Sequence, residues 1–196
     1  MNEEAVDPQH FETIYLIYHD EVSAEKVKAL MEVCSNAIMQ YSPKTLYFQF
    51  SSSGGSVDSA ITLYNFLKSL PCTIVMHNVG SIDSSANVVF MAGDERYAAP
   101  HTSFLFHGVG YGFGQAYLTK SQISEGLSIV SEAENKIAGI IAKSSNLSEA
   151  EVRQLFMEGE SKSATYAKEK GVITSLKEAS IPSGAPVYTI NTSTSV

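Results

Sequence analysis

Residues 80–93 read Gly80-Ser81-Ile82-Asp83-Ser84-Ser85-Ala86-Asn87-Val88-Val89-Phe90-Met91-Ala92-Gly93. A glycine and polar residues lead into an apolar run, which predicts a strand-to-helix turn with a serine hydroxyl, on Ser84 or Ser85, in the first helical turn. Upstream, residues 48–57 predict a strand that ends in small residues and opens a helix, so that free N–H groups can face an anion. Downstream, residues 99–108 place His107 at the end of an apolar strand. A hydroxyl, an amide cradle and an imidazole are the parts of acyl-transfer catalysis.

These segments together resemble the proteolytic subunit of the Clp protease, a self-compartmentalised serine peptidase. The likeness rests on their order: GGSV at 54–57, G-x3-S-S-A-x5-A-G at 80–93, then an apolar strand ending in His107. It covers roughly residues 14–174. It implies a crotonase-like α/β fold, a spiral of ββα units with mainly parallel strands and a protruding long handle helix. The implied function is a serine endopeptidase that cleaves peptides or unfolded polypeptide inside a ring oligomer.

The resemblance also implies a role for four residues. Ser84 is the nucleophile and His107 is the base, while the amides of Gly55 and Ser85 form the oxyanion hole. The oxyanion proposal also has a physical basis of its own, because both amides belong to helix starts, whose dipoles favour developing negative charge.

Three features depart from the family pattern. The family's third catalytic residue, an aspartate, falls on Gly159, and Glu158 or Glu160 beside it is the candidate replacement. If nothing orients the imidazole, the rate falls roughly ten-thousandfold, by analogy with serine proteases that lack this carboxylate. Asp83 stands where the family has a small residue, and a carboxylate opposes a developing oxyanion. Only residues 1–12 precede the first expected strand, whereas the family's longer segment docks an unfolding ATPase, which argues against that partner.

Composition excludes several other classes of protein. A chain of 196 residues with a net charge of −8 and no basic run favours one domain that does not bind nucleic acid. Cys34 and Cys72 lie in apolar stretches, which predicts buried thiols, no disulfide framework and a reducing compartment. An acidic start and the lack of an apolar run near ~18 residues predict a cytoplasmic protein away from membranes. We expect no cofactor and no bound metal.

The remaining pattern predicts one domain over residues 13–176, between a mobile N-terminal segment, 1–12, and a Ser/Thr/Pro-rich tail, 177–196. Strands alternate with helices, which predicts parallel pairing and reactive groups at the carboxyl ends of the strands. The expected strands are 14–18, 45–50, 73–76, 96–98, 103–106, 172–173 and, as an added edge, 187–190. The expected helices follow the caps Ser23, Thr119 and Ser148, begin at Val57, and cover 163–170.

Two segments have alternative interpretations. Residues 108–114 alternate glycine with larger residues, which leaves strand backbone open to close approach. In the resembled family the matching segment lines the cleft and pairs with substrate backbone, whereas a glycine loop without a ligand is the alternative. The helix from Thr119 to about Lys143 corresponds to the handle by which two heptameric rings stack, and an ordinary core helix is its alternative.

Each site residue also has an ordinary structural alternative. Ser84 is typical of a helix start, although Asp83 is the better cap. His107 also fits a buried core histidine, and Gly54 and Gly55 also suit a plain turn. A glutamate beside position 159 is more often a solvated charge in a loop than a catalytic residue. The weaker candidates for the base are the other four histidines, His77, His101, His10 and His19.

Two other functions fit the same chain. An inactive family member that serves as a ring subunit or scaffold is suggested by Gly159 and Asp83. A crotonase-type enzyme acting on acyl-coenzyme A thioesters would share the paired-amide oxyanion hole without a Ser–His pair. That alternative lacks an evident basic pocket for the nucleotide.

Overall fold

The fold is built on a mainly parallel sheet. The computed structural model describes residues 11–114 and 117–190. The strands in these ranges are β1 (Thr13–His19), β2 (Thr45–Ser52), β3 (Thr73–Asp83), β4 (Glu95–Ala98), β5 (Ser103–Leu105), β6 (Ser161–Ser163), β7 (Ser175–Leu176) and β8 (Val187–Thr189). Their order is β6-β5-β3-β2-β1-β8, with β4 paired to β3 and β7 to β4. Among these described strands only the β5–β6 pairing is antiparallel. The α/β class and the mainly parallel strands are confirmed.

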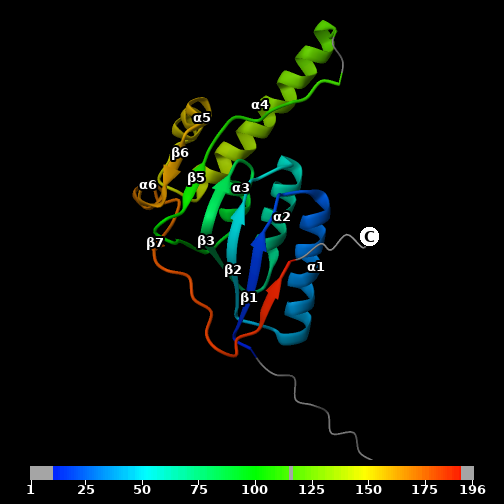
Figure 1. Ribbon diagram of the computed structural model, residues 1–196. Helices are drawn as coiled ribbons and strands as arrows, with labels where there is room; N and C mark the ends of the chain where they lie inside the picture. The colour runs from blue at the N-terminus through cyan, green and yellow to red at the C-terminus, as the bar shows by residue number, and fades with distance from the viewer. Residues whose placement is uncertain (1–10, 115–116, 191–196) are drawn as a thin grey trace, which may run out of the picture.

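Helices of the described part lie along one face of the sheet and beside its edge, and the longest of them extends beyond its end (Figure 1). They are α1 (Ala24–Tyr41), α2 (Val57–Ser69), α3 (Ala86–Phe90), α4 (Lys120–Lys143), α5 (Glu149–Glu158) and α6 (Ala164–Glu169). Figure 1 shows α1 and α2 along the same face of the sheet, whereas α4 projects well past the sheet. The expected protruding helix is therefore present. Within residues 11–114 and 117–190, no helix combines the length and the apolar character needed to span a membrane.

Capping side chains explain where the helices begin. Ser23 accepts a hydrogen bond from the N–H three residues later, at the start of α1. Full capping boxes open α4 and α5, in which Thr119 pairs with Gln122 and Ser148 pairs with Glu151. Each box satisfies two N–H groups that the first turn of a helix leaves free. The three helix starts agree with the sequence prediction.

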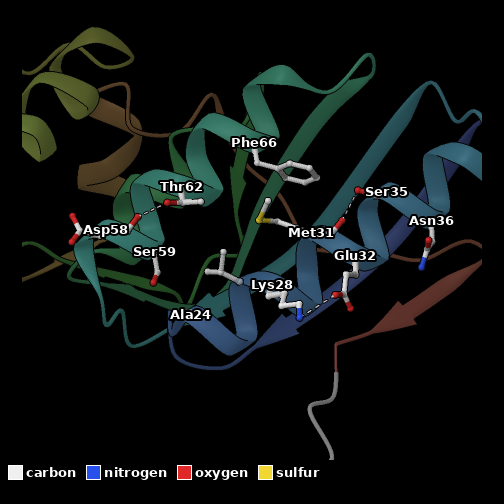
Figure 2. Close-up of a pocket in the computed structure, with 11 residues that line it drawn as sticks. Ala24, Lys28, Met31, Glu32, Ser35, Asn36, Asp58, Ser59, Thr62 and Phe66 are labelled. Atoms are coloured by element: carbon white, nitrogen blue, oxygen red, sulfur yellow. Dashed lines mark hydrogen bonds and ion pairs between the residues drawn. The ribbon is translucent and has the colours of Figure 1, made fainter.

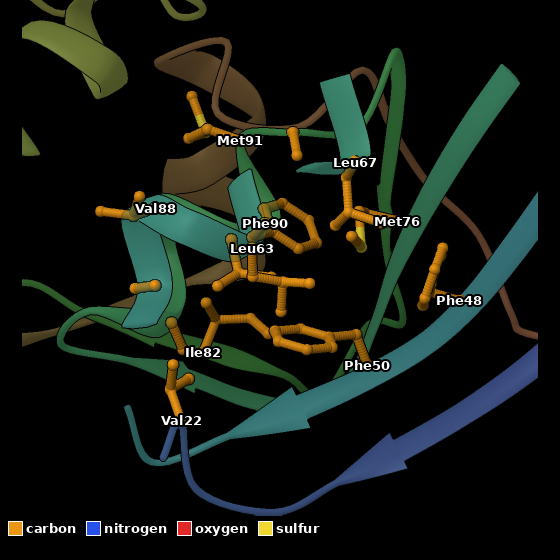
Figure 3. Close-up of a cluster of buried hydrophobic side chains, with 14 of the residues drawn as sticks. Val22, Phe48, Phe50, Leu63, Leu67, Met76, Ile82, Val88, Phe90 and Met91 are labelled. Carbon is orange, nitrogen blue, oxygen red and sulfur yellow. The ribbon is translucent and has the colours of Figure 1, made fainter. Parts of the chain in front are cut away.

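The core lies between the sheet and the helices α1, α2 and α3, and it continues to buried residues of α4, α5 and α6. Along β1 the buried residues Ile14, Leu16 and Tyr18 alternate with less buried ones, as the period of two in a strand requires. Figure 3 shows side chains from β2, β3, α2 and α3 in one cluster, among them Phe50 and Phe90, which are fully buried. Burying one side chain of this size stabilises the fold by about 1.5–3 kcal/mol.

Strand β3 is longer than the sequence pattern predicts. The apolar run indicates residues 73–76, whereas β3 continues to Asp83 because its first half pairs with β4 and its second half with β5. Its pairing with β2 also shifts register between Phe50 and Ser52. This irregularity bends β3 and leads its end directly into the turn at Ser84.

The C-terminal third holds further differences from the prediction. Residues 172–173 lie in a bend, and the strand there is β7, two residues later, because only that segment reaches β4. Strand β6 was not indicated by the pattern, since its three residues are polar. The edge strand at 187–190 is confirmed as β8, which pairs with β1. Residues 1–10 and 191–196, in the expected N-terminal segment and tail, lie outside the described residues.

Candidate active site

The serine turn joins β3 to α3. Ser84 has a left-handed backbone (φ 56°), which costs a residue other than glycine on the order of 1–3 kcal/mol. Its N–H donates to the Leu105 carbonyl (2.9 Å), which ties the turn to β5. The prediction that Asp83 caps the helix is wrong, because the cap position is Ser85. The Asp83 carboxylate instead accepts a hydrogen bond from the Ser81 hydroxyl (3.1 Å).

Asn87, which no sequence motif singles out, fixes the serine turn from α3. Its side-chain nitrogen lies within hydrogen-bond distance of three carbonyl oxygens, those of Ile82 (3.4 Å), Ser84 (3.0 Å) and Leu105 (2.9 Å). Its buried side-chain oxygen has no partner among the described residues. The available signal was an asparagine one turn after Ser84, because this residue type readily bonds nearby backbone.

The glycine loop after β2 approaches this turn more closely than a side chain would allow. Gly54 has φ +83°, and a Cβ there would lie 2.6 Å from the Asp83 carbonyl oxygen and 2.7 Å from Ser84 Cβ. The Ser85 hydroxyl donates to the Gly55 carbonyl (3.1 Å). The loop and the turn are thus packed and bonded to one another, which is more than a plain turn requires.

Two backbone amides beside Ser84 have no partner among the residues that the structure describes. Within the described ranges, the N–H groups of Gly55 and Ser85 donate no hydrogen bond to another protein group. Gly55 lies two residues before α2, and Ser85 lies directly before α3. Free N–H groups at helix starts favour negative charge. The pair can therefore stabilise an oxyanion.

His107 lies just after β5 and its side chain is exposed, so the interpretation as a buried core histidine is wrong. Its Nδ1 lies 2.8 Å from the Gly108 carbonyl oxygen. Because a carbonyl only accepts, Nδ1 carries the proton and Nε2 keeps a free lone pair. In the described residues His107 and Ser84 form no hydrogen bond with each other. Such bonds are often long in unliganded enzymes and tighten with substrate.

The four residues named from the sequence line one cavity of about 210 Å³. Ser84, Ser85, Gly55 and His107, together with Ser56, form its polar part. Asp83 is not among the lining residues. The remaining wall is largely apolar and includes Val57, Phe106, Ile137, Ile141 and Phe156, the last three from α4 and α5. A hydroxyl, an imidazole and two free amides around an apolar hollow can bind and attack a carbonyl group.

The structure does not bring the expected third catalytic residue to His107. Lys162 Nζ binds both candidates, Glu158 (2.8 Å) and Glu160 (3.1 Å), and neither carboxylate lines the cavity. The attraction of Lys162 lowers the pKa of Glu158. Gly159, at the position of the family aspartate, is the left-handed C-cap of α5 (φ 62°).

The glycine-rich segment after His107 forms an irregular loop. Residues 108–114 contain no strand, so the extended cleft strand of the resembled family is not seen here. Its Gly108, Val109 and Gly110 nevertheless line the cavity. The Val109 N–H donates to the Glu134 carboxylate of α4 (3.1 Å), a contact that no sequence pattern indicates.

The other histidines lie away from this cavity or outside the described residues. His77 is fully buried, with Nδ1 2.6 Å from the Tyr47 hydroxyl and Nε2 3.0 Å from the Lys177 carbonyl. Burial lowers its pKa. His19 and His101 are exposed elsewhere on the surface, and His10 lies outside the described residues.

A larger groove of about 780 Å³ lies between α1 and α2. Figure 2 shows Met31 and Phe66 facing each other across it. No histidine or cysteine lines the groove. The hydroxyls of Ser35 and Thr62 on its walls are bonded to carbonyls of their own helices. The groove is larger than the cavity at Ser84, but among the described residues its walls carry no pairing of a nucleophile with a histidine base.

Cysteines and metal-binding side chains add no second centre to the described residues. Cys34 and Cys72 are free thiols, the first buried as expected and the second only half-buried. Burial raises the pKa of the Cys34 thiol to about 12. Within residues 11–114 and 117–190 no group of three or more His, Cys, Asp or Glu side chains is placed to hold a metal ion.

Comparison with known proteins agrees with this geometry. The family model described as Clp protease matches residues 10–180. A curated relative from Corynebacterium jeikeium, ATP-dependent Clp protease proteolytic subunit 1, is 27% identical over 88 residues, which are 42% of this chain and 47% of the relative. The ATP-dependent Clp protease proteolytic subunit of Bdellovibrio bacteriovorus is 27% identical over 66 residues, 33% of this chain and 31% of that protein. The chain thus aligns with less than half the length of each relative.

Proposed function

Because this chain belongs to the Clp protease family, we propose that it is a serine endopeptidase that cleaves peptides or unfolded polypeptide through an acyl-enzyme. Ser84 is the nucleophile, His107 is the general base, and the amides of Gly55 and Ser85 form the oxyanion hole. The setting that we propose, by analogy with the family, is a homo-oligomeric ring in the cytoplasm. The mainly parallel α/β sheet agrees with the family's crotonase-like fold.

In the proposed reaction, His107 Nε2 takes the proton of Ser84 Oγ while this oxygen attacks the substrate carbonyl carbon. The carbonyl π electrons move to oxygen, and the two free amides stabilise the negative charge. As the carbon–nitrogen bond breaks, His107 returns the proton to the leaving amine and the acyl group stays on Ser84. A water molecule deprotonated by His107 then attacks the ester, which releases the acid and restores the serine.

The observation that carries this proposal is that one cavity is lined by Ser84, His107 and two amides without partners in the described part of the chain. The backbone of Ser84 adds support. A glycine would adopt φ 56° without strain, so a serine at this position costs stability that a purely structural turn need not lose. A nucleophile accounts for that cost.

The substrate class follows from the apolar wall of the cavity. Ile137, Ile141 and Phe156 come from α4 and α5 and face the same hollow as Ser84. Burying an apolar side chain there gains about 25 cal/mol per Å² of area removed from water. We therefore propose cleavage next to apolar residues, with little discrimination among them.

A fluorophosphonate probe and a fluorogenic peptide test the proposal. The probe is expected to label Ser84, and Ser84→Ala is expected to abolish labelling and to lower peptide hydrolysis by up to roughly a millionfold, as for other serine nucleophiles. Ser53→Ala is the matched control, because Ser53 is exposed in the same glycine loop and does not line the cavity. Folded protein without an adduct on Ser84, or labelling that survives Ser84→Ala, would refute the proposal.

A ring subunit or scaffold without activity is the second candidate. It is favoured by one observation, that Glu158 and Glu160 are bound to Lys162 rather than to His107. Peptide hydrolysis that Ser84→Ala abolishes would exclude it. The acyl-coenzyme A alternative gains no support from the family match.

A further inference from the structure

One peptide group beside the cavity is hydrogen-bonded at both ends. The carbonyl oxygen of Gly108 and the N–H of Val109 belong to the same planar amide. The oxygen accepts from His107 Nδ1 (2.8 Å), and the N–H donates to Glu134 Oε1 (3.1 Å). A continuous path therefore runs from the carboxylate, through the amide, to the imidazole.

We propose that Glu134 replaces the missing catalytic aspartate and acts on His107 through this peptide group. This inference rests on the proposed function for its catalytic meaning. An amide is a resonance system, so a negative charge at its N–H shifts electron density toward its oxygen. Hydrogen bonds in such chains strengthen one another, and a bond to an ionised group is about twice as strong as a neutral one. The Gly108 oxygen thereby becomes a stronger acceptor for His107 Nδ1–H.

The path does for His107 what a catalytic aspartate does in a triad. It keeps the proton on Nδ1, so that Nε2 is free to accept the proton of Ser84. It also stabilises the imidazolium that forms at that moment. Glu134 takes up no proton and does not touch the reacting atoms. It is a positioning residue.

Among the carboxylates near the site, Glu134 is the one arranged for this role. His107 is the only titratable side chain that lines the cavity, within the described residues. Asp83 is bonded to the Ser81 hydroxyl, and Lys162 binds the glutamates on both sides of position 159. Glu134 comes from α4, one turn before Ile137 of the cavity wall, and it is only partly exposed.

The absence of a side chain at Gly108 agrees with the close approach of this carboxylate. A Cβ at position 108 would lie 2.9 Å from Glu134 Oε1. Contacts this short are essentially never seen for a real Cβ, so a larger residue at position 108 would force the end of the Glu134 side chain to shift from its place beside the peptide group. The glycine therefore leaves the space that Glu134 occupies.

Two substitutions separate the charge of Glu134 from its shape. In Glu134→Gln the side-chain oxygen can still accept from Val109 N–H, but the negative charge is gone. Glu134→Ala removes both. Glu125→Gln is the matched control, since Glu125 is an exposed glutamate on the same helix and changes the net charge equally. The readouts are kcat and KM for the fluorogenic peptide and the rate of fluorophosphonate labelling at Ser84.

We expect Glu134→Gln to lower kcat and the labelling rate roughly ten- to hundredfold, by analogy with the loss of a hydrogen-bond partner behind a metal-bound histidine. KM and the control should stay within about twofold of the original protein. Full activity of Glu134→Gln would overturn the proposal, because it would reduce Glu134 to a neutral tether. An equal loss in Glu125→Gln would also overturn it, as an effect of net charge alone.

A readout independent of catalysis separates this inference from the proposed function. In protein with ¹⁵N-labelled histidine, the ring nitrogen shifts of neutral His107 report which nitrogen holds the proton. We expect Nδ1–H in the original protein and a shift toward Nε2–H in Glu134→Gln, even if Ser84 proves unreactive. The same tautomer in both proteins would overturn the inference, whereas missing Ser84 labelling alone would overturn only the proposed function.

Discussion

The nucleophile corner (Gly54, Gly55, Ser84 and Ser85) and the histidine loop (residues 107–114) meet at one cavity but are held in different ways. The corner is held by backbone acceptors: the Ser84 N–H donates to the Leu105 carbonyl at the end of β5, and the Ser85 hydroxyl donates to the Gly55 carbonyl within the corner. The histidine loop is largely exposed and contains no strand. Among the described residues, its one side-chain hydrogen bond to another element is the bond from the Val109 N–H to Glu134 of α4.

This difference indicates that contacts with the sheet and the core fix the positions of the hydroxyl and the amides. The position of the imidazole depends largely on the contact between its loop and α4. Changes in the corner should therefore lower both stability and reactivity. Changes in the loop should lower reactivity with little loss of stability, because few buried groups depend on the loop.

The largest effect is expected from the same substitution made once in each region. Gly54→Ala places a Cβ 2.6 Å from backbone at φ +83°. Strain alone should lower the free energy of unfolding by about 1–3 kcal/mol, and the overlap should add to it. Gly112→Ala meets nothing within 4 Å and should change stability by less than about 0.5 kcal/mol. Urea unfolding measures the stability of both variants. Equal losses of unfolding free energy would contradict the proposed difference between the corner and the loop.

The second effect concerns how the corner is fixed. Asn87→Ala leaves the carbonyls of Ile82, Ser84 and Leu105 without this donor, which should cost about 1–3 kcal/mol of unfolding free energy and should slow labelling at Ser84. Asn87→Asp should cost more, because a carboxylate would face three oxygens. Asn135→Ala, an exposed asparagine on α4, is the control. A corner that keeps full labelling after Asn87→Ala would show that Asn87 does not hold it.

The third effect is a change in the loop that should lower the labelling rate of Ser84 without lowering the stability of the fold. Gly108→Ala displaces the Glu134 carboxylate, which lies 2.9 Å from the new Cβ. Labelling at Ser84 should fall roughly tenfold, while the urea midpoint should stay close to that of Gly112→Ala. Stopped labelling reactions followed by intact-mass spectrometry give the rate. A parallel fall in stability would mean that the loop is as deeply built into the core as the corner is.

The smallest effect concerns α5, which brings Phe156 to the cavity wall. The N–H and the hydroxyl of Ser148, together with Lys170, lower the pKa of Glu151 to about 2. In the unfolded chain a glutamate titrates at about 4.3. The stabilisation is thus present above about pH 4.3 and is lost as the pH falls through about 2. The unfolding midpoints of the original protein and Glu151→Gln should converge over this range, and a constant difference would contradict the assignment.

Local features of the fold could be predicted from the sequence, and features that depend on distant partners could not. The caps Ser23, Thr119 and Ser148 act within three residues of themselves, so their pattern is visible in the chain. The extension of β3 to Asp83 depends on β4 and β5, which follow it in the sequence. Its apolar run alone indicates only the first part of the strand.

The candidate site divides in the same way. The order of the motifs along the chain, compared with the family pattern, predicts that Ser84 and His107 lie at the same site. The contact between Val109 and Glu134 spans 25 residues and joins a loop to a helix face. A glutamate on an amphipathic helix resembles any solvated charge, so nothing in the local pattern distinguishes Glu134 from Glu125. Only the folded chain reveals which of them meets the loop.

The left-handed residue that ends α5 can be replaced by a residue with a side chain. Gly159 has φ 62°, and a Cβ there would meet no atom within 4 Å. Aspartate is among the few residues that occupy this region of backbone space at modest cost. Gly159→Asp is therefore a substitution that the backbone can accommodate, and it would let the family's aspartate be compared with the proposed Glu134 arrangement inside a single molecule.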